Sequence, residues 1–319
     1  MASSKSVVLA ALVANGAIAV LKFGGYLLTG SPAMLSETYH SVSDTGNQVF
    51  LLIGIRYGGK SATREHPFGY GKAQFFYSFL VSVLLFGIAG WESLKHGYHA
   101  ITHPEPVNTG LVALPVPLPA VGPEIPSVWV NYTVLLGAIA FETYAFKKAY
   151  DAMSKQIADH EWSGFREAFR KTADVTVLTA LTEDAIALGG AGIALFGVFL
   201  SQYTGNPIYD AVSAALIGVM LMGFAVALAW ENKRLLLGES LPASEERDLR
   251  AIVTNHEGVV GIDDFRTVYF GPKQVLVTTD VSFDPAFDTV EMDDTISAIE
   301  AELLDAEPDI SKIYIEPER

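Results

Sequence analysis

The stretch Pro207–Asn232 reads PIYDAVSAALIGVMLMGFAVALAWEN, and the twenty residues from Ala211 to Trp230 include no charged side chain. A helix rises about 1.5 Å per residue, so twenty apolar residues reach across a hydrocarbon core about 30 Å thick. The composition agrees, because 50% of the 319 residues are hydrophobic and only 18% are charged, which is unusual for a soluble enzyme. The sequence therefore predicts a membrane protein.

Five further apolar runs of similar length precede this one. The six runs cover roughly residues 6–30, 34–57, 75–101, 128–150, 173–201 and 207–232. The first run is too long, and carries Lys22 too deep, for a cleaved signal peptide. Between the third and fourth runs, the five prolines of residues 111–126 predict a stiff loop, because each removes a helical donor. We therefore predict an α-helical membrane protein with six transmembrane helices.

The connections between the runs differ in charge. Three of them, near 31–33, 102–127 and 202–206, hold no Lys or Arg, whereas the alternate connections and the segment after the sixth run hold many: Lys60, Arg64, Lys72, Lys147, Lys148, Lys155, Arg166, Arg170, Lys171, Lys233 and Arg234. Lys and Arg near helix ends stay in the cytoplasm. Both the N and the C terminus are therefore predicted to be cytoplasmic, and we expect a multi-pass protein in the cell membrane of a prokaryote.

The last eighty residues form an acidic tail. Residues 240–319 hold 19 Asp and Glu against 6 Lys and Arg, a net charge of -13 out of -15 for the whole chain. Their pattern predicts, in order, helix 244–255, strands 259–270 and 274–283, helix 289–305 and strand 310–316. The resulting αββαβ order suits a small ferredoxin-like sheet with both helices on one face.

These features divide the chain into a six-helix transmembrane domain at 1–238 and a cytoplasmic αββαβ dimerisation domain at 239–319. About 75 residues make a marginal independent core, so docking or pairing of this domain is expected. The acidic balance argues against nucleic acid as a partner, because phosphate binding needs clustered Lys and Arg. The chain has no cysteine, so disulfides, thiolate metal sites and Cys nucleophiles are excluded.

Ionisable residues inside the membrane runs are the candidates for function, because each is costly to bury there. In the second run, SETYHSVSDTGNQ at 36–48 places His40 and Asp44 four residues apart. This spacing puts an imidazole and a carboxylate on one helical face, where both can share one cation; a hydrogen bond between the two is the alternative. The fifth run supplies Glu183 and Asp184. Adjacent side chains diverge by about 100 degrees, so we favour Asp184, with Glu183 completing the shell or pairing elsewhere.

Other polar residues in the runs have structural interpretations that compete with functional ones. Lys22 and Glu37 fall at similar depth, so we expect an ion pair that offsets their burial. Glu142 is expected to be a carboxylate at the inner interface, with gating or proton transfer as the alternative. The histidines at the outward end of the third run are spaced as i, i+3 and i+7, which suits either a release-side metal relay or surface histidines at a membrane interface: His96, His99 and His103.

Several of these segments together resemble the cation diffusion facilitators, also called cation efflux proteins. The likeness rests on Thr29-Gly30-Ser31 leading into SETYHSVSDTGNQ, on HPFGYGK at 66–72 and on Asp210 within PIYDAVSAALIGVML, and it covers almost the whole chain. KTADVTVLTALTEDAIALGG at 171–190 is most similar to the branch that contains mitochondrial-type zinc transporters. The resemblance implies a divalent metal held midway across the membrane by paired residues of the second and fifth helices.

Carried over residue by residue, the resemblance makes His40 and Asp44 the second-helix pair and Asp184 the distal member of the fifth-helix pair. The sequence departs from the family pattern at Ala180, where a ligand is expected four residues before Asp184, and Glu183 is the replacement that we expect. A cytoplasmic second site retains His66 but has Thr63 and Tyr70 in the other positions. The strand VTTDVSFD at 277–284 lacks the histidines of a tail metal site.

The resemblance implies a divalent metal transporter that exports zinc from the cytoplasm by proton antiport as a homodimer in the lipid bilayer. Manganese or iron efflux by the same mechanism is one alternative, because imidazole with carboxylates accepts these metals too. A non-transporting membrane scaffold or metal sensor is the other. The chain has no HExxH, GxSxG or glycine-rich phosphate loop, so we predict that it is not an enzyme and holds no resident cofactor, only transported metal and protons.

Overall fold

The computed structural model describes residues 2–107, 110–113, 124–159, 162–171 and 175–318. Within these ranges the side chains are described except at 2–11, 14, 112, 113, 124, 159, 169–171 and 175–180. The chain divides into two compact units. The first comprises Met1–Phe50 and Leu80–Leu228, and the second comprises Leu51–Phe79 and Ala229–Arg319.

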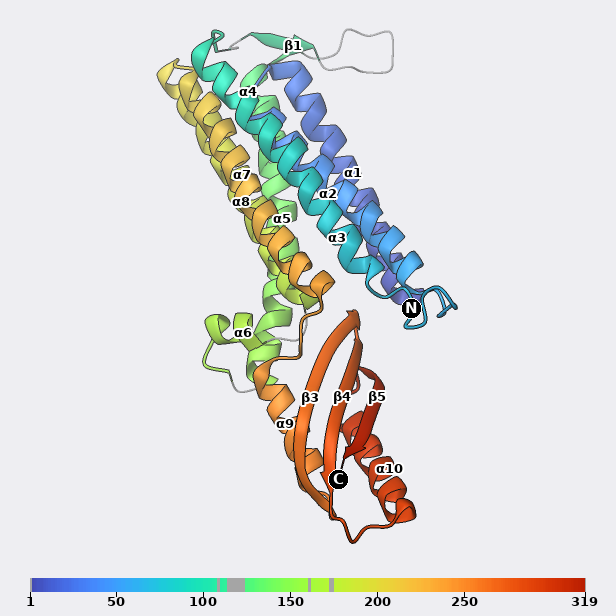
Figure 1. Ribbon diagram of the computed structural model, residues 1–319. Helices are drawn as coiled ribbons and strands as arrows, with labels where there is room; N and C mark the ends of the chain where they lie inside the picture. The colour runs from blue at the N-terminus through green and yellow to red at the C-terminus, as the bar shows by residue number, and fades with distance from the viewer. Residues whose placement is uncertain (1, 108–109, 114–123, 160–161, 172–174, 319) are drawn as a thin grey trace. The chain divides into compact units, whose positions relative to one another are not determined.

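Long helices occupy all six predicted runs (Figure 1). They are α1 (Ala2–Thr29), α2 (Pro32–Gly58), the stretch Ala73–Thr102, α5 (Ser127–Asp159), α7 (Val175–Thr204) and α8 (Ile208–Leu237). By length and composition, three segments among the described residues are suited to cross a membrane: Ala73–Thr102, Leu181–Thr204 and Ile208–Leu237. Helix α2 carries the polar segment 36–48, which lowers its mean hydropathy.

The third predicted helix is not uniform. It consists of α3 (Ala73–Leu84), a π-helical segment η1 (Leu85–Gly90) and α4 (Trp91–Thr102). Glycines bring this stretch into close contact with α8, since a Cβ added at Gly97 would lie 2.5 Å from the backbone nitrogen of Ala215 and one at Gly218 2.5 Å from that of Leu94. Small residues that let helix backbones approach are a common way to pack membrane helices. The contact therefore depends on the missing side chains.

Part of the proline-rich connection is more ordered than the expected loop. Strands β1 (Leu111–Ala113) and β2 (Glu124–Pro126) pair antiparallel, with Leu111 opposite Pro126. The loop prediction was wrong for these residues because Pro126 lies at the end of its strand, where a missing N–H is tolerated. The other four prolines of this connection lie outside the described residues. A short helix α6 (Phe165–Lys171), which the sequence did not predict, follows α5.

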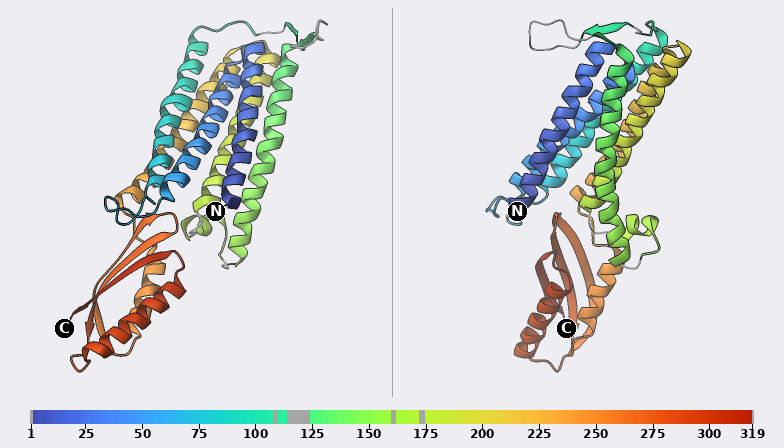
Figure 2. Two further views of the ribbon diagram at one scale, coloured as in Figure 1. Left: turned by 90° about the vertical axis from the view of Figure 1, so that its right-hand side faces the viewer. Right: turned by 180° about the vertical axis from the view of Figure 1, so that it is seen from behind.

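The acidic tail folds in the predicted αββαβ order. Its elements are α9 (Ala243–Thr254), β3 (Val259–Gly271), β4 (Gln274–Phe283), α10 (Thr289–Ala306) and β5 (Ile310–Glu318), all within two residues of the expected bounds (Figure 2). The strand order is β3-β4-β5, with β3 and β4 antiparallel and β4 and β5 parallel. The predicted mixed α/β arrangement of this region is confirmed.

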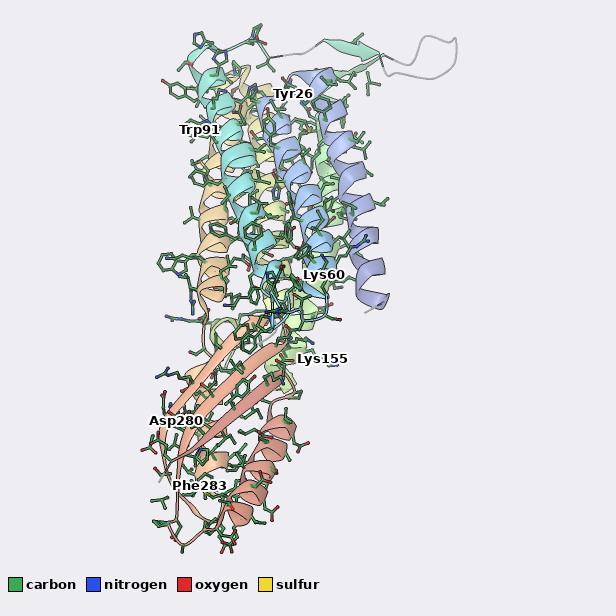
Figure 3. The ribbon with its side chains drawn as sticks, turned by 45° about the vertical axis from the view of Figure 1, so that its right-hand side comes forward. Tyr26, Lys60, Trp91, Lys155, Asp280 and Phe283 are labelled. Atoms are coloured by element: carbon green, nitrogen blue, oxygen red, sulfur yellow. The ribbon has the colours of Figure 1, made fainter. Side chains whose placement is uncertain are left out.

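Alternation along β4 builds the core of this sheet. Val275, Val277 and Val281 are fully buried, whereas Asp280 lies on the other face; Figure 3 marks Asp280 together with the buried Phe283. Both helices contribute to the same core, through Leu249 and Val253 of α9 and Ile299 and Leu303 of α10. Both therefore cover one face of the sheet, as predicted. Helix α10 begins with a capping box, in which the Asp288 carboxylate accepts the N–H groups of Val290 and Glu291.

Candidate metal site

The polar segment of α2 presents an imidazole and a carboxylate to the interior of the first unit. The side chain of His40 is 1% exposed and that of Asp44 is 13% exposed. Their closest atoms, His40 Nε2 and Asp44 Oδ2, are 3.6 Å apart, which is too long for a hydrogen bond. Neither His40 ring nitrogen has a hydrogen-bond partner among the described residues. Because buried polar atoms are normally paired, this arrangement suits a shared ligand better than a private hydrogen bond.

Helix α7 carries the carboxylates of Glu183 and Asp184 near this pair, and Asn47 of α2 bonds to one of them. The Asn47 side-chain amide donates to Glu183 Oε1 at 3.2 Å, and the Glu183 charge acts on both His40 and Asp44. Asp184 lies beside Glu183 and within electrostatic range of Asp44. Glu183 is thus the α7 carboxylate that contacts α2. The sequence did not single out Asn47, although the spacing 40, 44 and 47 follows one helical face.

Glu142 of α5 belongs to the same buried group. Its exposed fraction is 8%, and its charge acts on His40, Asp44 and Glu183. Helix α5 continues nine residues beyond the predicted end at 150, so Glu142 does not lie near the end of its helix as expected. Glu142 therefore lies near the middle of the helix.

A buried ion pair joins α1 to α2 next to this group. Lys22 Nζ lies 2.8 Å from Glu37 Oε2, and the two side chains are 1% and 0% exposed, which confirms the predicted pair. The Lys22 charge also acts on His40, Asp44 and Glu142. Glu37 Oε1 is buried without a hydrogen-bond partner in the described part of the chain.

The partner-free oxygen of Glu37 lies close to α7. A Cβ added at Gly190 would lie 2.6 Å from Glu37 Oε1. Because a real Cβ does not approach an oxygen that closely, the glycine at 190 is what makes room for this carboxylate. The packing of α2 against α7 therefore depends on Gly190, and this contact lies on the same two helices as the candidate ligands.

This group, hereafter the buried group, carries an excess of negative charge, and four of its eight members are buried and four half-buried. Its members are Lys22, Glu37, His40, Asp44, Asn47, Glu142, Glu183 and Asp184, so five carboxylates surround one ammonium. Carboxylates cannot all stay ionised in a medium of low polarity unless cations or protons balance them. A divalent metal ion and protons are the natural partners of such a group.

The candidate ligands do not converge on one point in this structure. Among the side chains that the structure describes, no three His, Asp or Glu residues are arranged to hold one metal ion. The candidate ligands instead form two sets, His40 with Asp44 on α2 and Glu183 with Asp184 on α7. Ala180 lies outside the described side chains. Closure of α2 on α7, with water or Glu142 filling the shell, is what a complete site would require.

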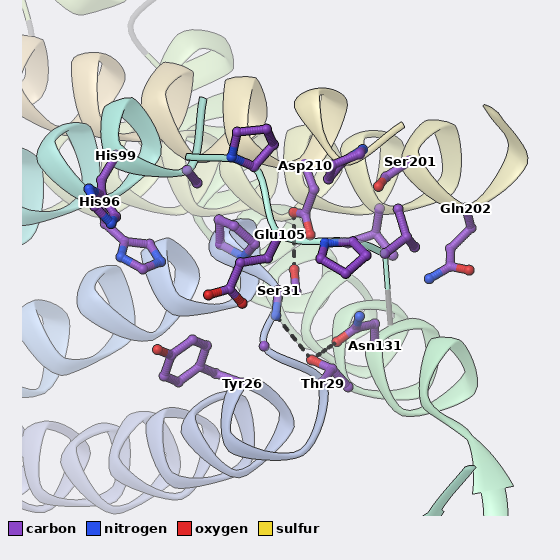
Figure 4. A pocket seen from close by; sticks show the side chains of 18 of the residues that line it. Tyr26, Thr29, Ser31, His96, His99, Glu105, Asn131, Ser201, Gln202 and Asp210 are labelled. Carbon is purple, nitrogen blue, oxygen red and sulfur yellow. Dashed lines mark hydrogen bonds between the residues drawn. The ribbon is translucent and has the colours of Figure 1, made fainter. Parts of the chain in front are cut away.

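A polar cavity of about 690 Å³ lies at the end of the first unit where α1 ends and α2 begins (Figure 4). Asp210 of α8 forms part of its lining and is 8% exposed. Asp210 Oδ1 accepts hydrogen bonds from the Ser31 hydroxyl and the Ala33 N–H, both at 3.0 Å, and Ser31 Oγ accepts from the Met34 N–H at 3.2 Å. These contacts satisfy free N–H groups at the start of α2. Asp210 therefore fixes the entry of the helix that carries His40.

The two other regions that the sequence singled out have their own arrangements. The His66 ring stacks on Tyr70 with centroids 4.3 Å apart, and the Thr63 hydroxyl lies 3.2 Å from the Tyr70 hydroxyl. In the acidic domain, burial raises the pKa of Tyr269 to about 12, and the charges of Glu245, Glu307 and Asp309 add to this shift. The carboxylates around Tyr269 thus act on one another and on a phenol that stays protonated.

Comparison with known proteins assigns both parts of the chain to one family. Residues 8–237 match the family described as the cation efflux transmembrane domain, and residues 241–319 match the cation efflux protein cytoplasmic domain. The second family is one of dimerisation domains, which suggests that the acidic domain pairs with another copy.

Three relatives illustrate the likeness. The human proton-coupled zinc antiporter SLC30A9, mitochondrial, is 28% identical over 87% of this chain and 46% of its own length. The Arabidopsis thaliana metal tolerance protein C4 is 27% identical over 88% of this chain and 57% of its own length. The cation-efflux pump FieF of Yersinia enterocolitica is 25% identical over 94% of this chain and 85% of its own length.

The chain thus spans about half the length of the human and plant relatives and most of the bacterial one. The transmembrane match covers well over half of the chain, and the polar group described above lies entirely within it. The chain therefore belongs to the cation efflux family, also called the cation diffusion facilitators, whose members are multi-pass membrane transporters of cations and not enzymes.

Proposed function

We propose that this protein exports a divalent metal ion, zinc in the first place, from the cytoplasm in exchange for protons. The observation that carries the proposal is the buried group in which five carboxylates of α2, α5 and α7 surround one ammonium beside an imidazole. Such a group gains the most from a cation of charge two, and protons can replace that cation one by one.

The ligand chemistry supports a divalent metal of the zinc type. His40 offers an imidazole nitrogen, and Asp44, Glu183 and Asp184 offer carboxylate oxygens, a set that zinc accepts. Glu183 supplies the ligand that Ala180 lacks, and the buried Glu142 adds a further carboxylate within electrostatic range of His40 and Asp184. The human relative is named as a proton-coupled zinc antiporter, which favours zinc for this chain.

A specific observation favours manganese or iron as the second candidate. The group contains one imidazole and four carboxylates outside the Lys22–Glu37 pair, and oxygen-rich sites suit manganese and iron better than zinc. The same mechanism would apply to these metals, so the transport experiment compares them directly.

Proton exchange follows from the chemistry of the ligands. Metal binding requires a neutral imidazole and ionised carboxylates, so metal and protons compete for the same atoms. If the helices expose the group alternately to the two sides, an inward proton gradient drives the metal outward. The separation of the ligands into an α2 set and an α7 set supports such a movement, because their closure would complete the site.

The distribution of Lys and Arg supports cytoplasmic N and C termini, and with them six transmembrane helices. In this orientation the cavity beside Asp210 opens outward. The matches at 8–237 and 241–319 support a transmembrane domain at 1–238 and a cytoplasmic domain at 239–319. The small core of the cytoplasmic domain favours a homodimer, and we place the protein in the cell membrane of a prokaryote.

Metal uptake into inside-out proteoliposomes tests the proposal. With the lumen made acidic, we expect zinc to accumulate against its gradient, and collapse of the pH difference with an ionophore to stop the accumulation. Manganese, iron(II) and cobalt are compared at equal concentration. Uptake of one metal that ignores the pH difference would refute proton antiport, and absence of uptake for all four metals would favour a scaffold or sensor.

A further inference from the structure

The outward cavity has the composition of a cation compartment. Among the residues that line it are two carboxylates, of Glu105 and Asp210, and three imidazoles, of His96, His99 and His103, but no Lys or Arg. Thr29, Ser31, Asn131, Ser201 and Gln202 add hydroxyl and amide groups. A lining with carboxylate, imidazole, hydroxyl and amide groups and without Lys or Arg favours cations over anions.

Several of these donors face one part of the cavity. Figure 4 shows the imidazoles of His96 and His99 and the Glu105 carboxylate directed toward the same space, with the Tyr26 hydroxyl nearby. His96 lies within electrostatic range of His99 and Glu105. His96 and His99 are neighbours at i and i+3 on α4, where Cβ atoms lie about 5–6 Å apart. The His96 ring also packs edge-on against Tyr26, with centroids 6.3 Å apart.

The cavity lies directly beyond the buried metal group along α2. Gly30, Ser31 and Pro32 line it, and His40 follows Pro32 by eight residues on the same helix. At about 1.5 Å per residue, the two regions are separated by about 12 Å along the helix axis. The cavity is therefore close enough to the buried group to receive a cation that leaves it on the outward side.

We propose that this cavity is a second, weaker binding site for the transported divalent cation, with His96 and His99 as its protein ligands and the Glu105 carboxylate as the charge that attracts the ion. The proposal rests on the proposed function, because it takes the same cation and the same outward direction. Imidazole and carboxylate together select a divalent metal of the zinc type over an alkali ion. Asp210 is a positioning residue here, since its Oδ1 is already used by the Ser31 hydroxyl and the Ala33 N–H.

The geometry also explains why this site is weak. The cavity offers the ion the two imidazoles of His96 and His99 near the end of α4, so water completes the coordination shell. His99 and Glu105 are exposed, and the His99 ring stacks on His103 with centroids 4.6 Å apart. A weak and partly hydrated site at the exit holds the ion long enough to prevent its return and still releases it.

Equilibrium dialysis of zinc against the full-length protein in lipid nanodiscs tests this site. The parent is expected to bind zinc in a tight and a weak class. The double variant His96→Ala/His99→Ala is expected to raise the dissociation constant of the weak class at least about 10-fold and to leave the tight class unchanged. His256→Ala, which removes a half-buried histidine of the acidic domain, is the control and is expected to leave both classes intact.

A second double variant separates this proposal from the proposed function. His40→Ala/Asp44→Ala is expected to lose the tight class and retain the weak one, and the weak class is then expected to disappear on addition of His96→Ala/His99→Ala. A weak class that persists without His96 and His99 would overturn the outward site. A missing tight class in the parent would count against the proposed function alone, since the weak class is measured independently.

Discussion

Replacing Asp44 with alanine is expected to reduce metal affinity at least about 100-fold and to bring gradient-driven uptake to the level of empty vesicles. Asp44 lies 3.6 Å from the unpaired His40 ring and within range of Glu142 and Asp184, so its carboxylate is shared by both sides of the proposed site. Loss of residues beyond the direct ligands of metal sites already costs 10- to 100-fold in affinity. Zinc binding by calorimetry and uptake by proteoliposomes measure the two effects.

A matched control separates this loss from a general effect of charge removal. Asp151 is an exposed carboxylate on α5, and Asp151→Ala is expected to bind and transport zinc like the parent. Thermal unfolding shows whether both variants fold. Parent-like uptake by a folded Asp44→Ala protein would exclude Asp44 as a ligand.

Replacing Lys22 with methionine is expected to destabilise the protein by about 3–5 kcal/mol, the usual cost of leaving one member of a buried ion pair alone. Lys22 and Glu37 are 1% and 0% exposed and 2.8 Å apart, and the remaining Glu37 Oε1 already has no hydrogen-bond partner among the described residues. Without Lys22, the five carboxylates of the buried group lose the one ammonium among its described members. Thermal unfolding in detergent, followed by a fluorescent or circular dichroism signal, measures the change.

The double variant Lys22→Met/Glu37→Met provides the internal check. Removing both charges is expected to restore most of the lost stability, because no unpaired charge is left buried. Lys147→Met on the exposed side of α5 is the control for loss of a lysine. If Lys22→Met unfolds at the temperature of the parent, the ion pair does not stabilise the bundle.

The sequence predicted the cytoplasmic domain most completely. Alternation of Val275, Val277, Thr279 and Val281 on β4 carried the period of a strand, and the observed burial follows that alternation residue by residue. Gly271 and Pro272 marked the turn that follows β3, whereas the Asp288 cap at the start of α10 emerged from the structure. Local patterns of this kind are strong signals because one face of the sheet is buried in the core and the other is more exposed to water.

The transmembrane region was predicted well in its helices and less well in its contacts. Hydrophobic runs locate helices, but they do not report where a helix ends when polar residues continue it, and α5 extends to Asp159 for this reason. The position of Glu142 near the middle of α5 depends on that extension. The π-helical segment at Leu85–Gly90 had no signal in the hydrophobic pattern either.

Contacts between helices set the details of the candidate site, and one sequence does not contain them. Which of the adjacent residues Glu183 and Asp184 reaches α2 depends on the rotation of α7 about its axis, and the hydrogen bond from Asn47 selects Glu183. Asp210 was recognisable as part of a family motif, but its bonds to Ser31 and Ala33 follow from the packing of α8 against the start of α2.

The central claim is that metal and protons exchange at the buried group of α2, α5 and α7. Its most direct test is to count the protons released when zinc binds to the purified protein in weakly buffered solution near neutral pH, using a pH indicator. We predict release of about one or more protons for each tightly bound zinc ion, and loss of both binding and release in His40→Ala/Asp44→Ala. Tight zinc binding that releases no proton, or equal release in the double variant, would contradict the account.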